Sequence, residues 1–155
     1  MQSASQAKVL LDPQLKRNAD QPTTGFVQYA AMSTKVAPFD NVHCRRAVQY
    51  AVDKSAVQTA RGAGQIAGGM LPPGIPGYDE GLDPYRTRSG KPQVDKARDE
   101  LRQCGKPDGF ATVIAGTDTP RSLKTAEAVP AALARAGITA RIEPADPSLY
   151  ARVSG

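Results

Sequence analysis

The sequence is poor in the side chains on which many enzymes and nucleic-acid-binding proteins rely. Its 155 residues include no tryptophan, two cysteines and one histidine, and aromatic residues make up only 5%. With so few aromatic side chains, the core must be built from Val, Ile, Leu and Ala. A stacking platform for nucleic-acid bases is not available either.

Long apolar runs are also missing. No stretch approaches the roughly 20 apolar residues that a transmembrane helix needs. The N-terminal MQSASQAKVLL lacks the basic region followed by an apolar region that defines a signal peptide. We therefore expect any export signal or lipid anchor to lie outside this sequence.

The charge balance is mildly basic, with 20 Lys and Arg against 15 Asp and Glu, or +5. Because the basic residues are scattered and interleaved with acids, a solvated surface is a better interpretation than a nucleic-acid site. Hydrophobic residues at 40% and charged residues at 23% are typical of one packed domain. We expect residues 1–155 to form one α/β domain, or one lobe of something larger.

The first sixty residues predict two helices and a strand. Residues 7–19 are helical in pattern, and Asp12-Pro13 can start a new turn there. FVQYAAMS, residues 26–33, is typical of a strand. Asp40 is placed to cap the next helix, because its carboxylate can accept a free amide of the first turn. That helix has one apolar stripe at 3.6 periodicity, made of Cys44, Ala47, Val48, Ala51, Val52 and Ala56.

The chain changes character at residues 61–92, where Gly and Pro are frequent. We expect a long loop there, and loops of this length inside a compact domain are often functional. The helical pattern returns over residues 93–103, with Gly105 as the stop. Its apolar positions are Val94, Ala97, Leu101 and Cys104.

Residues 110–143 predict one strand–helix–strand unit. The strands are FATVIA, residues 110–115, and ITARIE, residues 138–143, and Thr119-Pro120 starts the helix between them. Such a unit is expected to be parallel with a right-handed connection. PADPSLYARV, from residue 144, predicts the start of another helix.

None of the motifs in the sequence predicts catalysis. GAGQIAGG follows a helix rather than a strand and lacks the spacing of a dinucleotide-binding fingerprint. Asp79, Glu80 and Asp83 do not have the alternating ligands of a calcium loop. The serines lack a nucleophile-elbow context. We therefore expect a binding function, with no catalytic residues and no cofactor.

The two cysteines, Cys44 and Cys104, each lie on the apolar face of a predicted helix. Two buried free thiols acting as small apolar side chains would account for them. A disulfide also accounts for them if the two helices pack closely, and we favour it because both side chains point inward. The only histidine, His43, points away from the stripe that carries Cys44, so neither a metal site nor a catalytic thiol is expected.

Four stretches, taken in order, carry a resemblance to a known family. They are FVQYAAMSTKVAPFDNVHCRRAVQYAVDKSAV, MLPPGIPGY, VDKARDELRQCGKPDGF and TAEAVPAALARAGITARIEPADPSLY. Together they resemble the family 5 (peptide/nickel-type) extracellular solute-binding proteins of ABC importers, the dipeptide- and oligopeptide-binding group. That group shows PFDDVRVRQAxxYAIDR, a loop with LPP and a nearby Tyr, DPEKAKxLLxEAGxPDGF and AExIQxxLxxIGI. The similarity spans about residues 24–150.

The resemblance implies a non-enzymatic receptor with two lobes, of which this chain would supply one. That lobe would have the type II periplasmic-binding-protein-like fold, a mixed sheet with flanking helices. A peptide or another small solute would be enclosed between it and the missing second lobe, and passed to an ABC permease in the membrane. An extracellular or periplasmic location with a lipid anchor is implied as well.

Two segments correspond to family loops that approach the ligand. The first contributes Leu71, Pro72, Pro73 and Tyr78, and the second contributes Gly116, Thr117, Asp118 and Arg121. Some members have a ligand-contacting Arg early in the second loop, where this sequence has Gly116. Arg121 is near, although a solvated position in the first helical turn accounts for it better. The acidic residue that commonly holds a peptide's amino group lies beyond the end of this chain.

Three departures from the family pattern bear on structure. VHCR and QCG place cysteine where the family usually has an apolar residue and an alanine, which favours a Cys44–Cys104 disulfide in an oxidising exterior. Pro130 stands where the family tends to have Gln, and it should kink the helix near Ala126.

The rival to a receptor lobe is a free-standing protein-interaction module that uses the exposed inter-lobe face.

Overall fold

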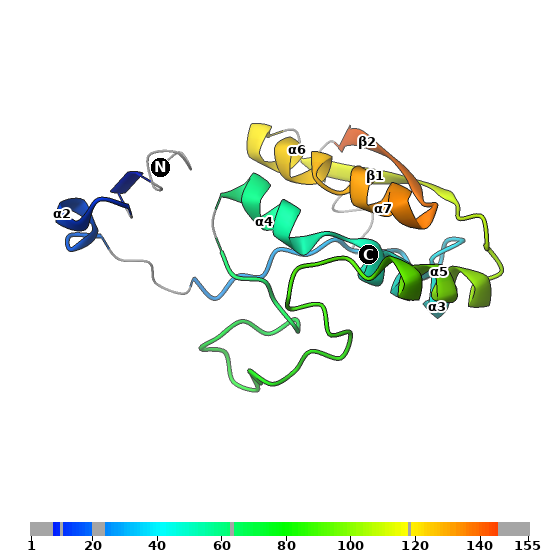
Figure 1. The fold of residues 1–155 in the computed structure, drawn as a ribbon, viewed down its shortest axis with the longest axis horizontal. Coiled ribbons are helices and arrows are strands. Elements are labelled where there is room, and N and C mark those ends of the chain that lie inside the picture. The colour runs from blue at the N-terminus through cyan, green and yellow to red at the C-terminus, as the bar shows by residue number, and fades with distance from the viewer. Residues whose placement is uncertain (1–7, 10, 20–23, 63, 118, 146–155) are drawn as a thin grey trace.

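A parallel pair of strands packed against short helices forms the centre of the fold (Figure 1). The computed structural model describes residues 8–9, 11–19, 24–62, 64–117 and 119–145. Its elements, in chain order, are α2 (Pro13–Lys16), α3 (Val42–Ala51), α4 (Lys54–Arg61), α5 (Val94–Gln103), β1 (Ala111–Thr117), α6 (Pro120–Glu127), α7 (Pro130–Ala136) and β2 (Thr139–Ala145).

The two strands confirm the predicted strand–helix–strand unit. β1 and β2 pair in parallel, with Ile114 opposite Ile142, and α6 and α7 connect them. Thr139 N–H donates to Phe110 O over 2.9 Å and sets the register at the start of the pair. The helix predicted from residue 144 lies largely outside the described residues, and β2 itself continues to Ala145.

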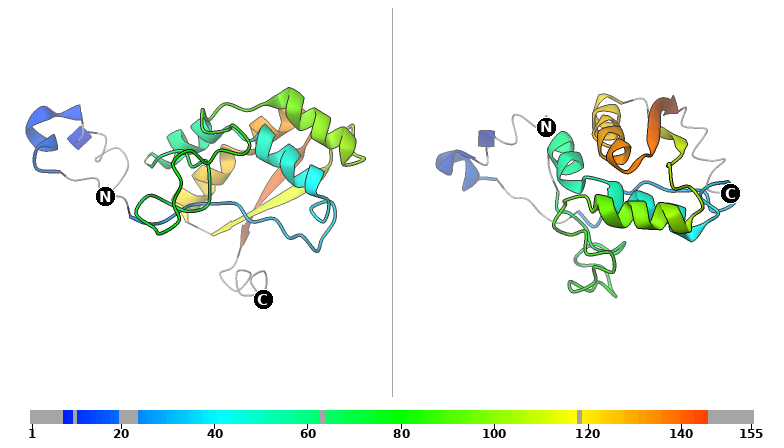
Figure 2. Two further views of the ribbon diagram at one scale, coloured as in Figure 1. Left: turned by 90° about the horizontal axis from the view of Figure 1, so that it is seen from below. Right: turned by 45° about the vertical axis from the view of Figure 1, so that its right-hand side comes forward.

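The core lies where α3 and α5 pack beside each other and against α7 (Figure 2). Several of its fully or nearly buried positions are alanines, and small side chains let helix backbones approach closely. Leu101, Leu133 and Ile138 are the largest buried apolar side chains of this cluster. Within α3, the residues of the predicted apolar stripe are therefore buried or half-buried, as expected.

The helix predicted to follow Asp40 is wrong at both ends, in its capping residue and in the residue at which it stops. Asn41 rather than Asp40 is the cap, and its Oδ1 accepts the His43 amide over 2.9 Å. The helix ends at Ala51, because Val52 is extended and the Asp53 carboxylate caps a new helix by accepting the Ala56 amide over 2.9 Å. A strong internal cap thus divides one predicted helix into α3 and α4.

The strand predicted at residues 26–33 is not formed in the structure. The segment contains neither strand nor helix, and Phe26 and Tyr29 are 87% and 62% exposed. A strand needs a neighbour for its backbone hydrogen bonds, and none is provided by the described residues. For the same reason the sheet in this part of the chain is a two-stranded parallel one rather than the mixed sheet that was expected.

Pro130 interrupts the helical stretch between the strands, as predicted. α6 ends at Glu127, and Pro130 becomes the first residue of α7. Proline has no amide to donate and its fixed φ suits the first helical position. The break therefore lies a little after Ala126, in the residues just before the proline.

The Gly- and Pro-rich segment is tied to the helices at its base. Residues 64–92 contain neither helix nor strand. Gln93 N–H donates to Tyr50 O over 2.7 Å, and Ser55 N–H donates to Gly90 O over 3.2 Å.

Among the described helices, none is long and apolar enough to cross a bilayer.

Candidate functional site

The first predicted ligand segment presents apolar side chains to solvent. Leu71 is 46% exposed and Tyr78 is 38% exposed. Pro72 is half-buried, and Pro73 is exposed. Two turns shape the segment, because Ile75 N–H donates to Pro72 O over 3.3 Å and Tyr78 N–H donates to Ile75 O over 3.0 Å. The segment is thus an ordered turn with an apolar outer surface.

The second predicted segment follows the carboxyl end of β1, where α/β folds commonly bind ligands. Gly116 is in β1, and a Cβ there would lie 3.3 Å from Ser122 Oγ, so the strand and α6 approach closely. Thr117 is the last residue of β1, whereas Asp118 lies outside the described residues. Arg121 is exposed in the first turn of α6.

The structure does not bring these two segments together. In Figure 1 and in the right-hand view of Figure 2, α4 lies between the loop of residues 64–92 and the sheet with α6. The segments therefore do not form one enclosed pocket within this part of the chain. They would meet a common ligand only with additional protein around them.

Sequence reasoning missed a polar network that holds the long loop on α4. Lys54 Nζ donates to Thr87 Oγ1 over 2.8 Å and to Ala67 O over 3.2 Å. The Asp83 carboxylate accepts the amides of Thr87 and Arg88 over 3.0 and 2.9 Å. Only the spacing of Asp83 ahead of these two amides could have indicated these bonds.

Burial and charge shift the pKa values of this network. Burial lowers the pKa of Lys54 below its usual 10.5, although the Asp83 carboxylate acts in the opposite direction. Desolvation acts to raise the pKa of Asp83, but the amides of Arg88 and Thr87, followed by the charges of Lys54 and Arg88, hold it below its usual 3.8. The network therefore keeps a carboxylate ionised inside the loop.

Arg88 ties the outer part of the loop to this network. Its guanidinium donates to Glu80 O, and to Leu82 O over 3.1 Å. Gly68 makes room for it, because a Cβ there would lie 2.3 Å from Leu82 O and 2.8 Å from the guanidinium. The bonds run mainly to backbone groups, so these residues position the loop rather than carry out chemistry.

The disulfide between Cys44 and Cys104 is present, which confirms the predicted pairing. Their Cα atoms are 5.3 Å apart and 60 residues apart in sequence. The bridge joins the first turn of α3 to the end of α5. His43 Nδ1 lies 2.7 Å from Glu100 Oε2 beside it and adds a polar link between the same helices.

The described residues do not form a metal centre. Within them, no three His, Cys, Asp or Glu side chains converge on a point where they could hold an ion. The lone histidine is engaged with Glu100 on the outside of the helix pair. The described residues thus form an α/β unit with ordered loops.

Comparison with known proteins gives the family. The model for bacterial extracellular solute-binding proteins, family 5 (middle region), matches residues 1–154, and the chain belongs to this family. It is 34% identical over 142 residues to heme-binding protein A of Haemophilus influenzae, covering 87% of this chain and 25% of that protein. It is 30% identical over 123 residues to the dipeptide-binding protein of Escherichia coli K12, covering 75% and 22%.

Solved structures agree with the sequence relatives. Clavulanic acid biosynthesis oligopeptide binding protein 2 superposes with a TM-score of 0.86 at 39% identity, over 97% of this chain and 28% of that one. The periplasmic binding protein DppA of Helicobacter pylori, solved with the peptide STSA, gives a TM-score of 0.65 at 32% identity, over 76% and 22%. The chain thus spans about a quarter of the length of these relatives.

Proposed function

We propose that this chain forms part of the ligand-binding surface of an extracellular receptor that delivers a peptide or another small solute to an ABC permease. The carrying observation is the superposition on an oligopeptide-binding protein over 97% of the chain. Membership of family 5 and the names of the relatives support the same role. The proposed role is binding, without a chemical step.

Within this proposal, the ligand meets the two loop segments identified above. Leu71 and Tyr78 supply exposed apolar surface, and Arg121 supplies an exposed polar side chain in the first turn of α6, after the carboxyl end of β1. A second lobe would complete the enclosure, since ligand sites usually bury most of a small ligand's surface. The receptor would then act at the outer face of the cytoplasmic membrane, held there by a lipid anchor, and would deliver its ligand to the permease within that membrane.

A chimera tests this proposal. Residues 1–155 would replace the matched segment of the clavulanic acid oligopeptide-binding protein, and a panel of short peptides would be titrated by calorimetry. The chimera should bind peptides in the micromolar range, because it regains the enclosing surface and the closing motion. The 155-residue chain alone should show no binding at the same concentrations.

Matched variants locate the site in the chimera. Arg121→Ala should weaken binding about tenfold, because the ligand loses its contact with the guanidinium. Arg102→Ala, on the exposed face of α5, should leave the affinity unchanged. Micromolar binding by the isolated chain, or a folded chimera that binds none of the peptides its parent binds, would contradict the proposal.

Exposed apolar side chains favour a second candidate, a protein-interaction module. Phe26, Tyr29 and Met70 are each more than half exposed. The two candidates differ in what covers these side chains: a second lobe in the receptor, or a separate protein in the module. Sedimentation equilibrium of the 155-residue chain and of the chimera distinguishes the two when the protein that covers them in the module is a second copy of this chain: a receptor lobe predicts a monomeric chimera, and such a module predicts self-association in both.

A further inference from the structure

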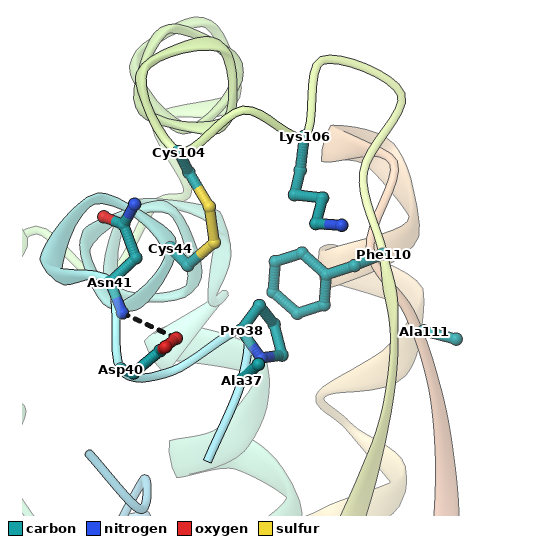
Figure 3. A pocket seen from close by; sticks show the side chains of 9 residues that line it. All are labelled: Ala37, Pro38, Asp40, Asn41, Cys44, Cys104, Lys106, Phe110 and Ala111. Carbon is teal, nitrogen blue, oxygen red and sulfur yellow. Dashed lines mark hydrogen bonds between the residues drawn. A yellow bond between two sulfur atoms is a disulfide. The ribbon is translucent and has the colours of Figure 1, made fainter. Parts of the chain in front are cut away.

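A groove of about 440 Å³ lies beside the disulfide (Figure 3). One wall is the turn of residues 37–41 before α3, and the other is the end of α5 from Cys104 to Lys106. Phe110 and Ala111 close it at the amino end of β1. β1 is seven residues long, so about 20 Å separates the groove from the segment after the carboxyl end of this strand. The groove is therefore distinct from the proposed ligand loops.

Two opposite charges stand at opposite ends of this groove in the view of Figure 3. Among the described residues, no acceptor is bonded to the Lys106 ammonium. At the other end, the Asp40 carboxylate accepts only the Asn41 amide, over 3.0 Å, from this part of the chain. Each charge thus has bonding capacity left for a partner of opposite sign.

The surface between the charges is apolar. The Phe110 ring lies there, held edge-to-face against Phe39 with the ring centroids 5.7 Å apart. Pro38 and the disulfide sulfurs complete it (Figure 3). Aromatic and sulfur surfaces both favour contact with apolar side chains.

The groove is rigid before any ligand arrives. Arg45 Nη1 donates to Phe39 O over 2.6 Å and to Asp40 O over 3.1 Å, which fixes the first wall. Lys106 N–H donates to Leu101 O over 2.9 Å at the end of α5, which fixes the second. The disulfide joins the two walls covalently. A preformed site loses less conformational entropy on binding than a flexible one.

We propose that this groove binds a short zwitterionic peptide with apolar side chains, independently of the cleft between lobes. The peptide ammonium meets Asp40, its carboxylate meets Lys106, and its side chains cover Phe110, Pro38 and the Cys104 side of the disulfide. The groove volume is within the usual range for small ligands.

The test is a titration of the 155-residue chain with the dipeptide Leu-Leu, followed by amide chemical shifts. Shifts should saturate with a Kd on the order of 1 mM, as suits an open groove, and they should map to residues 37–44 and 104–111. Asp40→Asn and Lys106→Gln should each weaken binding about two- to fivefold. Asp95→Asn and Lys91→Gln, exposed charges outside the groove lining, are the matched controls and should change nothing.

N-acetyl-Leu-Leu-amide, which has no terminal charges, should produce no saturable shifts in the groove. The proposal is overturned if the blocked peptide binds as well as the free one, or if neither groove variant alters the affinity. It is also overturned if the shifts map only to residues 71–78 and 116–121. That last result would support the receptor function while removing the second site, so the two proposals fail separately. The spectra of the variants also report whether each is folded.

Discussion

At the scale of single residues, two glycines four positions apart have the same backbone conformation and different surroundings. Gly105 and Gly109 have φ of +75° and +85°. A Cβ at Gly105 would meet nothing within 4 Å, whereas a Cβ at Gly109 would lie 1.9 Å from Gly137 O. Because the obstacle is backbone, it cannot rotate away. Gly109 therefore determines how closely the start of β1 approaches the turn before β2.

Gly109→Ala should cost about 3 kcal/mol of unfolding free energy, since backbone strain and overpacking add. Gly105→Ala should cost only about 1 kcal/mol, from the left-handed backbone alone. Urea unfolding of the two variants measures the difference. Equal losses at the two positions would show that the contact with Gly137 does not constrain the fold.

Asp83 gives a pH dependence whose sign follows from its lowered pKa. A carboxyl whose folded pKa lies below 3.8 stabilises the fold fully above that value and loses its contribution as the pH falls through the folded value. Asp83→Asn should therefore lower the urea midpoint at pH 7, and the difference from wild type should shrink as the pH falls below 3.8. A gap between wild type and variant that is constant from pH 7 to pH 2 would contradict this account.

At the scale of elements, the disulfide is the strongest link between α3 and α5. It closes a loop of 60 residues, for which the chain-entropy model gives an upper value of about 4 kcal/mol. Cys44→Ala/Cys104→Ala should lower the unfolding free energy by about 2–4 kcal/mol. Dithiothreitol should destabilise the wild type and leave the double variant unchanged, which separates loss of the bridge from loss of packing. No difference in stability between the two proteins would refute this role.

The sequence largely predicted which segments are helices and which are strands. It did not predict the residues at which they begin and end. The apolar periodicity located α3 and α5 because their buried residues follow one helical face. The break at Val52 was missed because the apolar stripe continues past it, while the local Asp53 cap outweighs that pattern. Pro130 was predicted correctly because its effect depends on its own missing amide rather than on neighbours. The strand at residues 26–33 was wrong because pairing depends on a partner that the pattern does not contain.

At the scale of the whole molecule, the candidate site was only partly predictable. The family resemblance identified the two loop segments, but no sequence pattern shows that α4 lies between them (Figure 1). The Lys54–Asp83–Arg88 network was missed because its members are separated by many residues and bond mainly to backbone. Long-range proximity of this kind comes from the packed fold and not from local spacing.

The core of this part of the chain is small. Apart from Cys44, the large side chains that are fully buried are Leu101, Leu133 and Ile138, and the rest of the cluster is mainly alanine. A small core gives marginal stability, because little apolar surface leaves water on folding. The disulfide and the loop network therefore have a larger share in holding the lobe together than they would in a larger domain.

The hydrogen bonds at the base of the long loop have an evolutionary consequence. Tyr50 with Gln93, and Ser55 with Gly90, bring the two ends of the segment side by side whatever lies between them. Each doubling of a flexible loop costs only about 0.6 kcal/mol. Insertions, deletions or exchange confined to residues 71–78 would thus leave α4 and the Lys54–Asp83–Arg88 network in place. Evolution can therefore change the outer turns of this loop, Leu71 and Tyr78 among them, without changing the structure of the helices at its base.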